Sequence, residues 1–381
     1  MWRRTSPSPC LGSYSSPDPA ASVEELTFRL HPDQAPSRPV SIVRRVFSLP
    51  TLVSLALAGA FLAFLATRLD MDLAETWQQL RSANPFYLLL AVIIHYTTFF
   101  FRGLRWRLLL NNAAHPDEER AGAFQCAQMV LLGWFANSVA WLRLGDAYRA
   151  YLYHEESRAP FVRTVGTIVS ERLLDAATMV VLLALCLPFI VGAGLGIGLT
   201  ITATAAGLLA ILLAGVILIG IAGRREGLSG FFQALLSWLP DRLSSWFVQR
   251  LRQFREGTIQ SLKSVPLAAL WGLLGWLAEI ARLYLVTQAL GLDLSAALIV
   301  FLTLANSLLT LVPTPGGIGA VEAGLGGLLK QLTTLSTPAA LALVLVDRAI
   351  SYLSVIVTGA ILFVLRWLLR RRGNPQSGTG A

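Results

Sequence analysis

Acid–arginine pairs recur inside apolar segments of this chain. Glu171, Arg172 and Asp175 fall several residues into an apolar run, and on a helix Arg172 and Asp175 are i, i+3 neighbours. Asp347 and Arg348 repeat the pair in a later run. An ionisable residue at membrane depth costs about 2.5–3.5 kcal/mol on insertion scales, so the pairs predict a site that binds a charged group. The alternative is that they are ion pairs that only lock helices together.

Further residues of the same types flank these pairs. Arg143, Asp146 and Arg149 lie at i, i+3 and i+6 around a glycine, and Tyr352 follows Arg348 by four residues. The guanidinium fork of arginine matches a phosphate, which suits a phospholipid headgroup. Simple anchoring at the cytoplasmic surface is the alternative for Arg143 and Arg149.

The two groups belong to an internal repeat. Ala-Asn-Ser at 136–138 recurs at 305–307, and the step of 25 residues from Asp146 to Glu171 recurs from Glu322 to Asp347. The second copy adds a glycine-rich stretch at 313–319, and non-helical backbone at membrane depth is tolerated only inside protein or beside a water-filled cavity. The glycines of that stretch are Gly316, Gly317 and Gly319. We therefore predict a polar cavity between two halves, with a chance match of short apolar strings as the alternative.

The elements that carry these residues must lie in a membrane. The chain has 381 residues, of which 55% are hydrophobic and 14% charged, and this composition excludes a soluble enzyme. The formal net charge of +9 suits an anionic membrane surface better than nucleic acid. The apolar runs are roughly 50–67, 85–101, 122–141, 164–191, 198–222, 266–290, 296–312, 318–332 and 338–365.

Arginines beside these runs predict their orientation through the positive-inside rule. Both ends of 122–141 are flanked by arginines, so that run is expected to be re-entrant, and 296–332 is expected to dip in from the other side. The fold class predicted is an all-α polytopic membrane protein with about six to eight transmembrane helices and two opposed re-entrant segments. Inverted repeats of this kind are typical of secondary transporters.

The remaining segments define the domain boundaries that we expect. Residues 1–40, rich in proline and serine, read as a disordered cytoplasmic tail, 41–372 as one membrane domain, and 373–381 as a second tail. Within the domain, repeat one covers about 122–191 and repeat two about 296–366. An amphipathic stretch at about 224–263 is expected to lie in the inner interface. Both termini are expected in the cytoplasm of a bacterium or archaeon.

The other polar residues are interpreted as structural. Arg102, Arg105 and Arg107 follow an apolar run and are interpreted mainly as interfacial anchors. His95 is expected to serve packing or hydrogen bonding. The three cysteines are scattered, so we expect no disulfide framework, no metal and no cofactor.

Five motifs in order resemble a known family. They are Arg102-x-x-Arg-Trp106, Leu-Gly-Asp-x-x-Arg149, Glu171-Arg-x-x-Asp175, Pro315-Gly-Gly-x-Gly-x-x-Glu322 and Asp347-Arg-x-x-x-Tyr352. Together they are similar to the lysylphosphatidylglycerol synthase transmembrane-region family, also described as flippase-like, over about residues 42–370. In the bacterial multiple peptide resistance factor, this region is linked to moving an aminoacylated phospholipid between leaflets and precedes a cytosolic aminoacyltransferase domain. This sequence stops at Ala381, so we expect no synthase activity.

The resulting hypothesis is a non-enzymatic protein that moves a phospholipid or glycolipid headgroup between leaflets. Arg172 and Arg348 are expected to bind phosphate alternately. The carboxylates expected to orient these arginines are Glu171, Asp175 and Asp347, and those expected to gate the cavity or bind a cationic headgroup are Asp146 and Glu322. The alternative is a non-catalytic membrane subunit that presents lipid to a separate aminoacyl- or glycosyltransferase. The partners considered are therefore membrane lipids, such a transferase and a second copy of the chain, and nucleic acid is excluded.

Overall fold

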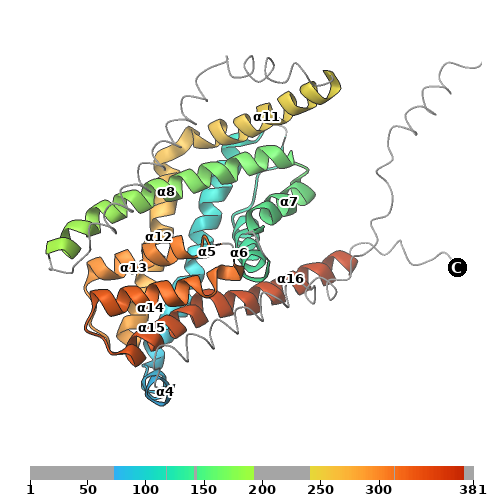
Figure 1. Cartoon of the computed structure of the whole chain (residues 1–381). Coiled ribbons are helices and arrows are strands. Elements are labelled where there is room, and N and C mark those ends of the chain that lie inside the picture. The colour runs from blue at the N-terminus through green and yellow to red at the C-terminus, as the bar shows by residue number, and fades with distance from the viewer. Residues whose placement is uncertain (1–72, 117, 141–143, 193–240, 313, 373–381) are drawn as a thin grey trace, which may run out of the picture. The chain divides into compact units, whose positions relative to one another are not determined.

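The described part of the chain is built from helices. The computed structural model describes residues 73–116, 118–140, 144–192, 241–312 and 314–372, all of them within one compact unit, Leu49–Ala381. No strand occurs among these residues (Figure 1). Four helical segments in them are long and apolar enough to cross a membrane: Pro85–Ala113, Phe161–Ile190, Ser244–Ala289 and Thr337–Leu369. The chain is therefore an all-α multi-pass membrane protein, as its composition predicts. The expected runs at 50–67 and 198–222, the two tails and residues 224–240 of the amphipathic stretch lie outside the described residues.

The first half of the described chain contains five helices. They are α4 (Leu73–Arg81), α5 (Pro85–Ala113), α6 (Ala123–Val139), α7 (Gly145–Ser157) and α8 (Phe161–Gly192). Helix α5 begins where the side chain of Asn84 accepts the amide proton of Phe86 and Pro85 occupies the first turn. It runs 29 residues and continues well past 101, where the sequence pattern ended the second apolar run.

The second half repeats this order of elements. Its elements are α11 (Asp241–Ser261), the short η2 (Leu262–Ser264), α12 (Val265–Ala289), α13 (Ala296–Leu309), the turn η3 (Pro315–Gly317), α14 (Ala320–Leu332), α15 (Thr337–Arg348), the π-helical η4 (Ala349–Leu353) and α16 (Ser354–Arg372). Helices α6 and α7 form a hairpin that is followed by α8, and α13 and α14 form a hairpin that is followed by α15 (Figure 1). Helices α5 and α12, which precede the two hairpins, pack side by side.

The hairpin helices are short for a membrane crossing. Helix α6 has 17 residues and α13 has 14, or about 25 and 21 Å at 1.5 Å per residue. A hydrocarbon core of about 30 Å needs about 20 residues. These lengths fit the re-entrant segments predicted from the arginine pattern, and their entry from opposite sides stays a prediction.

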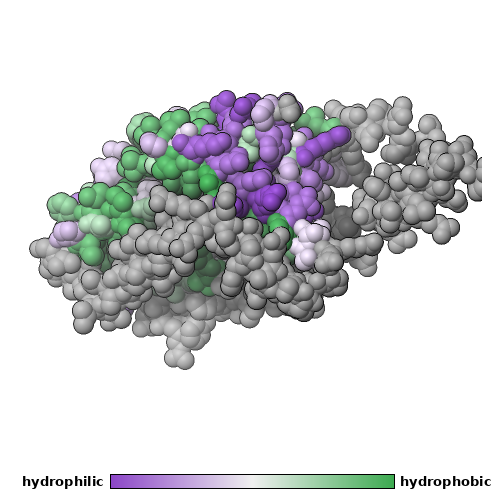
Figure 2. Space-filling view, turned by 90° about the horizontal axis from the view of Figure 1, so that it is seen from above, coloured by the Kyte–Doolittle hydropathy of each residue, from purple (hydrophilic) through white to green (hydrophobic). Residues whose placement is uncertain are grey.

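Apolar and polar surfaces separate along the helices. Seen from above, hydrophilic side chains gather over α7 and α11, whereas hydrophobic ones lie over the C-terminal part of α8 (Figure 2). Val181, Leu185 and Phe189 of α8 are more than half exposed, as lipid-facing side chains are. Helix α11 packs against α8, and the side chain of Thr258 donates to the carbonyl of Gly166 at 3.3 Å.

Candidate functional site

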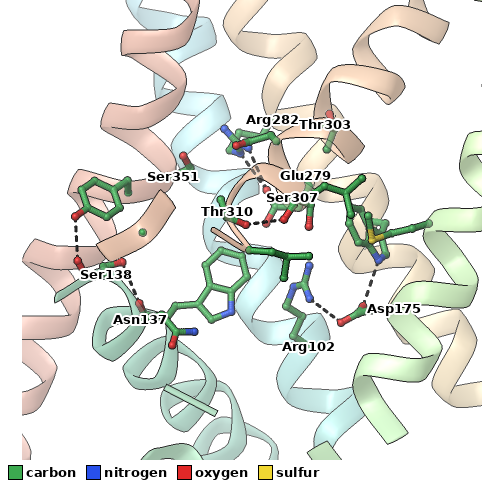
Figure 3. Close-up of a pocket in the computed structure, with 18 of the residues that line it drawn as sticks. Arg102, Asn137, Ser138, Asp175, Glu279, Arg282, Thr303, Ser307, Thr310 and Ser351 are labelled. Carbon is green, nitrogen blue, oxygen red and sulfur yellow. Dashed lines mark hydrogen bonds and ion pairs between the residues drawn. The ribbon is translucent and has the colours of Figure 1, made fainter. Parts of the chain in front are cut away.

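A cavity of about 330 Å³ lies between the two halves (Figure 3). Both copies of the Asn-Ser repeat line it: Asn137 and Ser138 from the end of α6, and Asn306 and Ser307 from the end of α13. The charged residues in its wall are Arg102, Arg172, Asp175, Glu279, Arg282 and Arg348. The repeat found in the sequence therefore converges on one polar space.

A buried ion-pair network holds the first half together. Arg105 of α5 is fully buried and donates to Asp175 at 2.8 Å and to Glu171 at 3.0 Å. Arg149 of α7 donates to the other oxygen of Glu171 at 2.8 Å. A buried guanidinium is tolerated only when it is paired, so this network fixes α5, α7 and α8 against one another.

The second half has an equivalent but smaller network. Arg282 of α12, also buried, pairs with Asp347 of α15 and with Glu279 at 3.2 Å. The side-chain amide of Asn306 reaches Asp347 at 3.5 Å. This network fixes α12 against α15 beside the cavity.

The two arginines expected to bind phosphate are held in the same way. Arg172 of α8 makes a bidentate pair with Asp146 at the start of α7, at 2.7 and 3.0 Å. Arg348 at the end of α15 donates to Glu322 at the start of α14 at 2.9 Å, and to the carbonyl of Gly316 at 2.8 Å. Each acid precedes its arginine by 26 residues. Each hairpin thus presents one acid, near the start of its second helix, to an arginine on the helix that follows.

The turns of the hairpins require glycine. The Gly145 amide donates to Asn137 Oδ1 at 2.7 Å, and a Cβ at Gly145 would lie 1.9 Å from the carbonyl oxygen of Gly133. In the second turn Gly316, Gly317 and Gly319 all have positive φ, of 60°, 72° and 86°, which side chains disfavour. The Gly319 amide donates to Glu322 at 2.6 Å, so the acid that holds Arg348 also fixes this turn.

Aromatic rings surround the centre of the cavity. The guanidinium of Arg102 lies 5.2 Å from the ring of Trp134 and 5.8 Å from the ring of Trp276, and it contacts Asp175 at 3.5 Å. These distances are those of cation–π contacts. Trp276 also donates its indole N–H to Asp175 at 3.2 Å. Arg102 therefore lies where residues of both halves meet.

Tyr352 connects the two halves. Its ring lies 4.6 Å from the guanidinium of Arg348, and its hydroxyl donates to the carbonyl of Ser138 in the first hairpin at 2.9 Å. It belongs to the π-helical η4, an irregularity that often marks functional sites.

Most of the predicted site residues come together. Each of them lines the cavity, contacts a residue that lines it, or contacts a residue that holds its wall. These residues are Asp146, Arg149, Glu171, Arg172, Asp175, Gly316, Gly317, Gly319, Glu322, Asp347, Arg348 and Tyr352. Arg143 lies outside the described residues.

Two expectations about these residues need correction. Glu171 and Asp347 do not orient the arginines next to them in sequence, because consecutive helical residues point about 100° apart; they pair with other arginines instead. Asp146 and Glu322, which were expected to gate the cavity or bind a cationic headgroup, are the acids that pair closely with Arg172 and Arg348, and Asp175 contacts Arg172 at 3.5 Å. Arg102 and Arg105 are not interfacial anchors, because α5 continues past them and turns both into the protein interior.

Several residues of the cavity wall were not among the predicted site residues. They are Trp134, Trp276, Glu279 and Arg282, together with Asn137 and Asn306, which the sequence analysis noted only as part of the repeat. A usable signal existed for Glu279 and Arg282, since they form an acid–arginine pair at i, i+3 in the apolar run 266–290. The same spacing in Arg102 and Arg105 would have aligned α5 with α12 and extended the repeat.

The side chains present suit an anion better than a metal ion. Within the described residues, no group of three or more His, Cys, Asp or Glu side chains is placed to hold a metal. Cys126 and Cys186 are free and buried. The polar wall of the cavity holds two carboxylates, Asp175 and Glu279, beside four arginines and several amides and hydroxyls, and the latter groups bind phosphate oxygens.

Comparison with known proteins places the chain among membrane proteins. The family described as Lysylphosphatidylglycerol synthase TM region matches residues 51–359. A UPF0104 membrane protein of Methanocaldococcus jannaschii is 29% identical over 61% of this chain and 94% of its own length. A UPF0104 membrane protein of Methanothermobacter thermautotrophicus is 26% identical over 73% of this chain and 85% of its own length. Glycosyltransferase AglD of Haloferax volcanii is 25% identical over 84% of this chain, and the match covers 54% of that longer protein.

Proposed function

Because the chain belongs to the lysylphosphatidylglycerol synthase TM region family, we propose that this membrane protein handles lipids and moves a phosphate-bearing headgroup between leaflets. The substrate class is a phospholipid or a glycolipid carrier. The chain itself supplies the path, and no synthase chemistry is assigned to it.

The observation that carries this proposal is the matched pair of arginines on one cavity. Arg172 and Arg348 both line the space, and each is held by an acid of the preceding hairpin. In transporters built from inverted repeats, the substrate site lies at the interface of the two repeats, which lets it open to either side of the membrane. Structural ion pairs alone would not need to face a shared polar cavity.

The partners of the arginines suggest how the headgroup exchanges. The side chain of Arg172 is 38% exposed and that of Asp146 35%, whereas those of Arg348 and Glu322 are only 10% and 13% exposed. A phosphate competes with a carboxylate for the same guanidinium fork, because each can accept two parallel hydrogen bonds from arginine. In this conformation the headgroup would therefore reach Arg172 first. Transfer to Arg348 would follow when the second hairpin opens.

Translocation in liposomes tests the proposal. The purified protein is reconstituted with a fluorescent phosphatidylglycerol, and the fraction of probe protected from an external quencher is followed over time. We expect Arg172→Gln and Arg348→Gln each to reduce translocation at least tenfold, with little change in reconstitution. Arg250→Gln is the matched control, because Arg250, like Arg348, lies over an aromatic ring, that of Trp246 at 5.5 Å, but on α11 and away from the cavity. Full translocation by Arg172→Gln would show the mechanism to be wrong.

A second candidate function rests on the similarity to Glycosyltransferase AglD. In that protein the matching region is part of a chain nearly twice as long as the match. A separate membrane subunit that presents lipid to a transferase would use the same cavity without moving lipid alone. Stable co-purification with a transferase, together with no translocation by the wild-type protein in liposomes, would favour this function.

A further inference from the structure

The second half carries an excess of negative charge beside the cavity. In the ion pairs of this half, Glu279, Asp347 and Glu322 share two arginines, Arg282 and Arg348. Arg102 also faces Glu279, but it pairs with Asp175. Asp347 pairs with Arg282, and Glu322 pairs with Arg348. Glu279 shares Arg282 with Asp347, so one carboxylate lacks a full counter-charge.

The unmatched charge is located at one atom of Glu279. The residue is 93% buried, since only 7% of its surface is exposed, and Arg282 contacts its Oε2 at 3.2 Å. Its Oε1 is buried and has no hydrogen-bond partner within the part of the chain that the structure describes. A buried carboxylate oxygen without a donor is costly, whereas protonation turns the group into a neutral acid.

His95 lies close to this carboxylate and is also unsatisfied. It is fully buried on α5, and both of its ring nitrogens lack a hydrogen-bond partner among the described residues. The rings of Phe99 and Trp134 surround it, with centroids 5.3 and 6.4 Å away. His95 and Glu279 interact electrostatically. His95 does not line the cavity, but Trp134, which it contacts, does.

The groups around this pair favour a cation that can be taken up and released. The charged or titratable side chains that face Glu279 or His95 are Arg282 on α12, Arg102 on α5, Asp347 and Arg348 on α15, Asp175 on α8 and Tyr352 on η4. Residues 296–309 of α13 contain no titratable side chain, and residues 123–139 of α6 contain only Cys126. Counting Glu279 itself, this set has three arginines and three carboxylates, so it has no excess of positive charge. A proton fits better than a metal ion, because the described residues offer no metal-binding group of three ligands.

We propose that Glu279 and His95 form a proton-binding site, occupied when an anionic headgroup enters the cavity. This proposal deepens the proposed function and partly rests on it. A phosphate that binds at Arg348 takes away part of the positive charge that balances Glu322 and Asp347. Uptake of one proton by Glu279 restores neutrality on that side, so headgroup and proton would move together.

Infrared difference spectroscopy on the whole protein in lipid nanodiscs tests the site without any substrate. Spectra recorded at about pH 8 and about pH 5, on either side of the usual pKa of histidine, should show the carbonyl stretch of a buried protonated carboxyl group in the wild type. Glu279→Gln should remove this band. Glu118→Gln, which removes a carboxylate paired with Arg163 away from the cavity, should keep it. His95→Gln should shift the pH at which the band appears, and this variant serves if Glu279→Gln does not fold.

Absence of the band in the wild type, or its persistence in Glu279→Gln, overturns the proposal. The liposome assay then separates this inference from the proposed function. If the wild type translocates phosphatidylglycerol but the rate does not change with an imposed pH difference, the proton-site proposal is wrong and the proposed function stands. If the band is present and Glu279-dependent but no lipid moves, the proton site stands and translocation is wrong. If both hold, Glu279→Gln should translocate at a rate that no longer responds to pH.

Discussion

The two halves of the protein share one scaffold and differ in charge. Arg105 of the first half and Arg282 of the second pair with acids 66 and 65 residues further on. In each hairpin, the acid and the arginine that it pairs with are 26 residues apart in the sequence. The same arrangement of paired side chains therefore appears twice, so the differences between the two copies are informative about function.

Three positions break the equivalence. Arg102 in α5 corresponds to Glu279 in α12, each three residues before the buried arginine. Four residues after the buried acid, the first half has Asp175 and the second has Ser351. Three residues after the hairpin acid, the first half has Arg149, whereas the second has Leu325, a core residue.

These exchanges give the two ion-pair networks beside the cavity opposite charge. The network of the first half sets four arginines, at positions 102, 105, 149 and 172, against three carboxylates, at 146, 171 and 175. The second sets two arginines against three carboxylates. Under the proposed function, a phosphate would be attracted to the first half, and its transfer to the second would require that half to lose negative charge. The asymmetry gives a reason for the proton to bind at Glu279 of the second half.

The largest expected effect comes from removing the central arginines. Arg282→Gln leaves Asp347 with only the 3.5 Å contact of Asn306 and leaves Glu279 without an arginine partner among the described residues. Removing one partner of a buried pair costs about 3–5 kcal/mol. We expect Arg282→Gln to lower the thermal unfolding midpoint in detergent more than Arg105→Gln does.

The first half tolerates the equivalent change because its partners are redundant. After Arg105→Gln, Glu171 keeps Arg149 at 2.8 Å, and Asp175 keeps Arg102 and the indole of Trp276. Equal losses in the two variants would contradict the comparison. As a control, neutralising the stranded acid in Arg282→Gln/Asp347→Asn should recover part of the lost stability.

The next effect concerns the turns of the two hairpins. Gly145→Ala would drive a methyl group into the carbonyl of Gly133, at 1.9 Å, and only a shift of the whole hairpin relieves it. Gly316→Ala meets the ring of Tyr352 at 2.0 Å, and that side chain can rotate. Overpacking costs about 1–3 kcal/mol, so we expect Gly145→Ala near the upper end of this range. Gly316→Ala should lower the stability by less, although the φ of 60° at this position adds strain to an alanine.

A double variant separates these two causes at Gly316. Gly316→Ala/Tyr352→Ala removes the clash and leaves the strain, so its unfolding midpoint should match that of Tyr352→Ala within the cost of the strain alone. A much larger loss would mean that the turn, and not the ring, limits the second hairpin.

Sequence alone predicted the all-α membrane fold, the repeat, and five residues of the cavity wall: Arg172, Asp175, Gly316, Arg348 and Tyr352. Those predictions rested on patterns that survive without coordinates: apolar runs, the 25-residue step between acids, and ionisable residues where a membrane disfavours them. The pairings were not predictable, because the partner of Glu171 depends on the rotation of α8 and on which helix lies beside it. The resulting error was to assign Glu171 and Asp347 to the arginines next to them.

The misread arginines of α5 have a different cause. The positive-inside rule treats each arginine near an apolar run as a marker of the membrane surface. Arg102 and Arg105 lie within a helix of 29 residues and point into the protein, which the rule does not consider. Their spacing of three residues, matched by Glu279 and Arg282, was the evidence for an internal role.

The smallest expected effect tests the two asparagines of the repeat. Asn137 accepts the amide proton of Gly145 at 2.7 Å and so fixes the first turn, whereas Asn306 has only a 3.5 Å contact to Asp347, and its Oδ1 lacks a partner among the described residues. A lost hydrogen bond costs about 1 kcal/mol, so Asn137→Ala should lower the unfolding free energy by about that much, and Asn306→Ala by much less. Chemical denaturation in detergent measures both. If Asn306→Ala is nearly neutral in stability yet slows lipid translocation, its free oxygen serves the headgroup and not the fold, and the first hairpin is the rigid half of the pair. If it costs as much as Asn137→Ala, both asparagines fix their turns and the comparison loses this difference in rigidity.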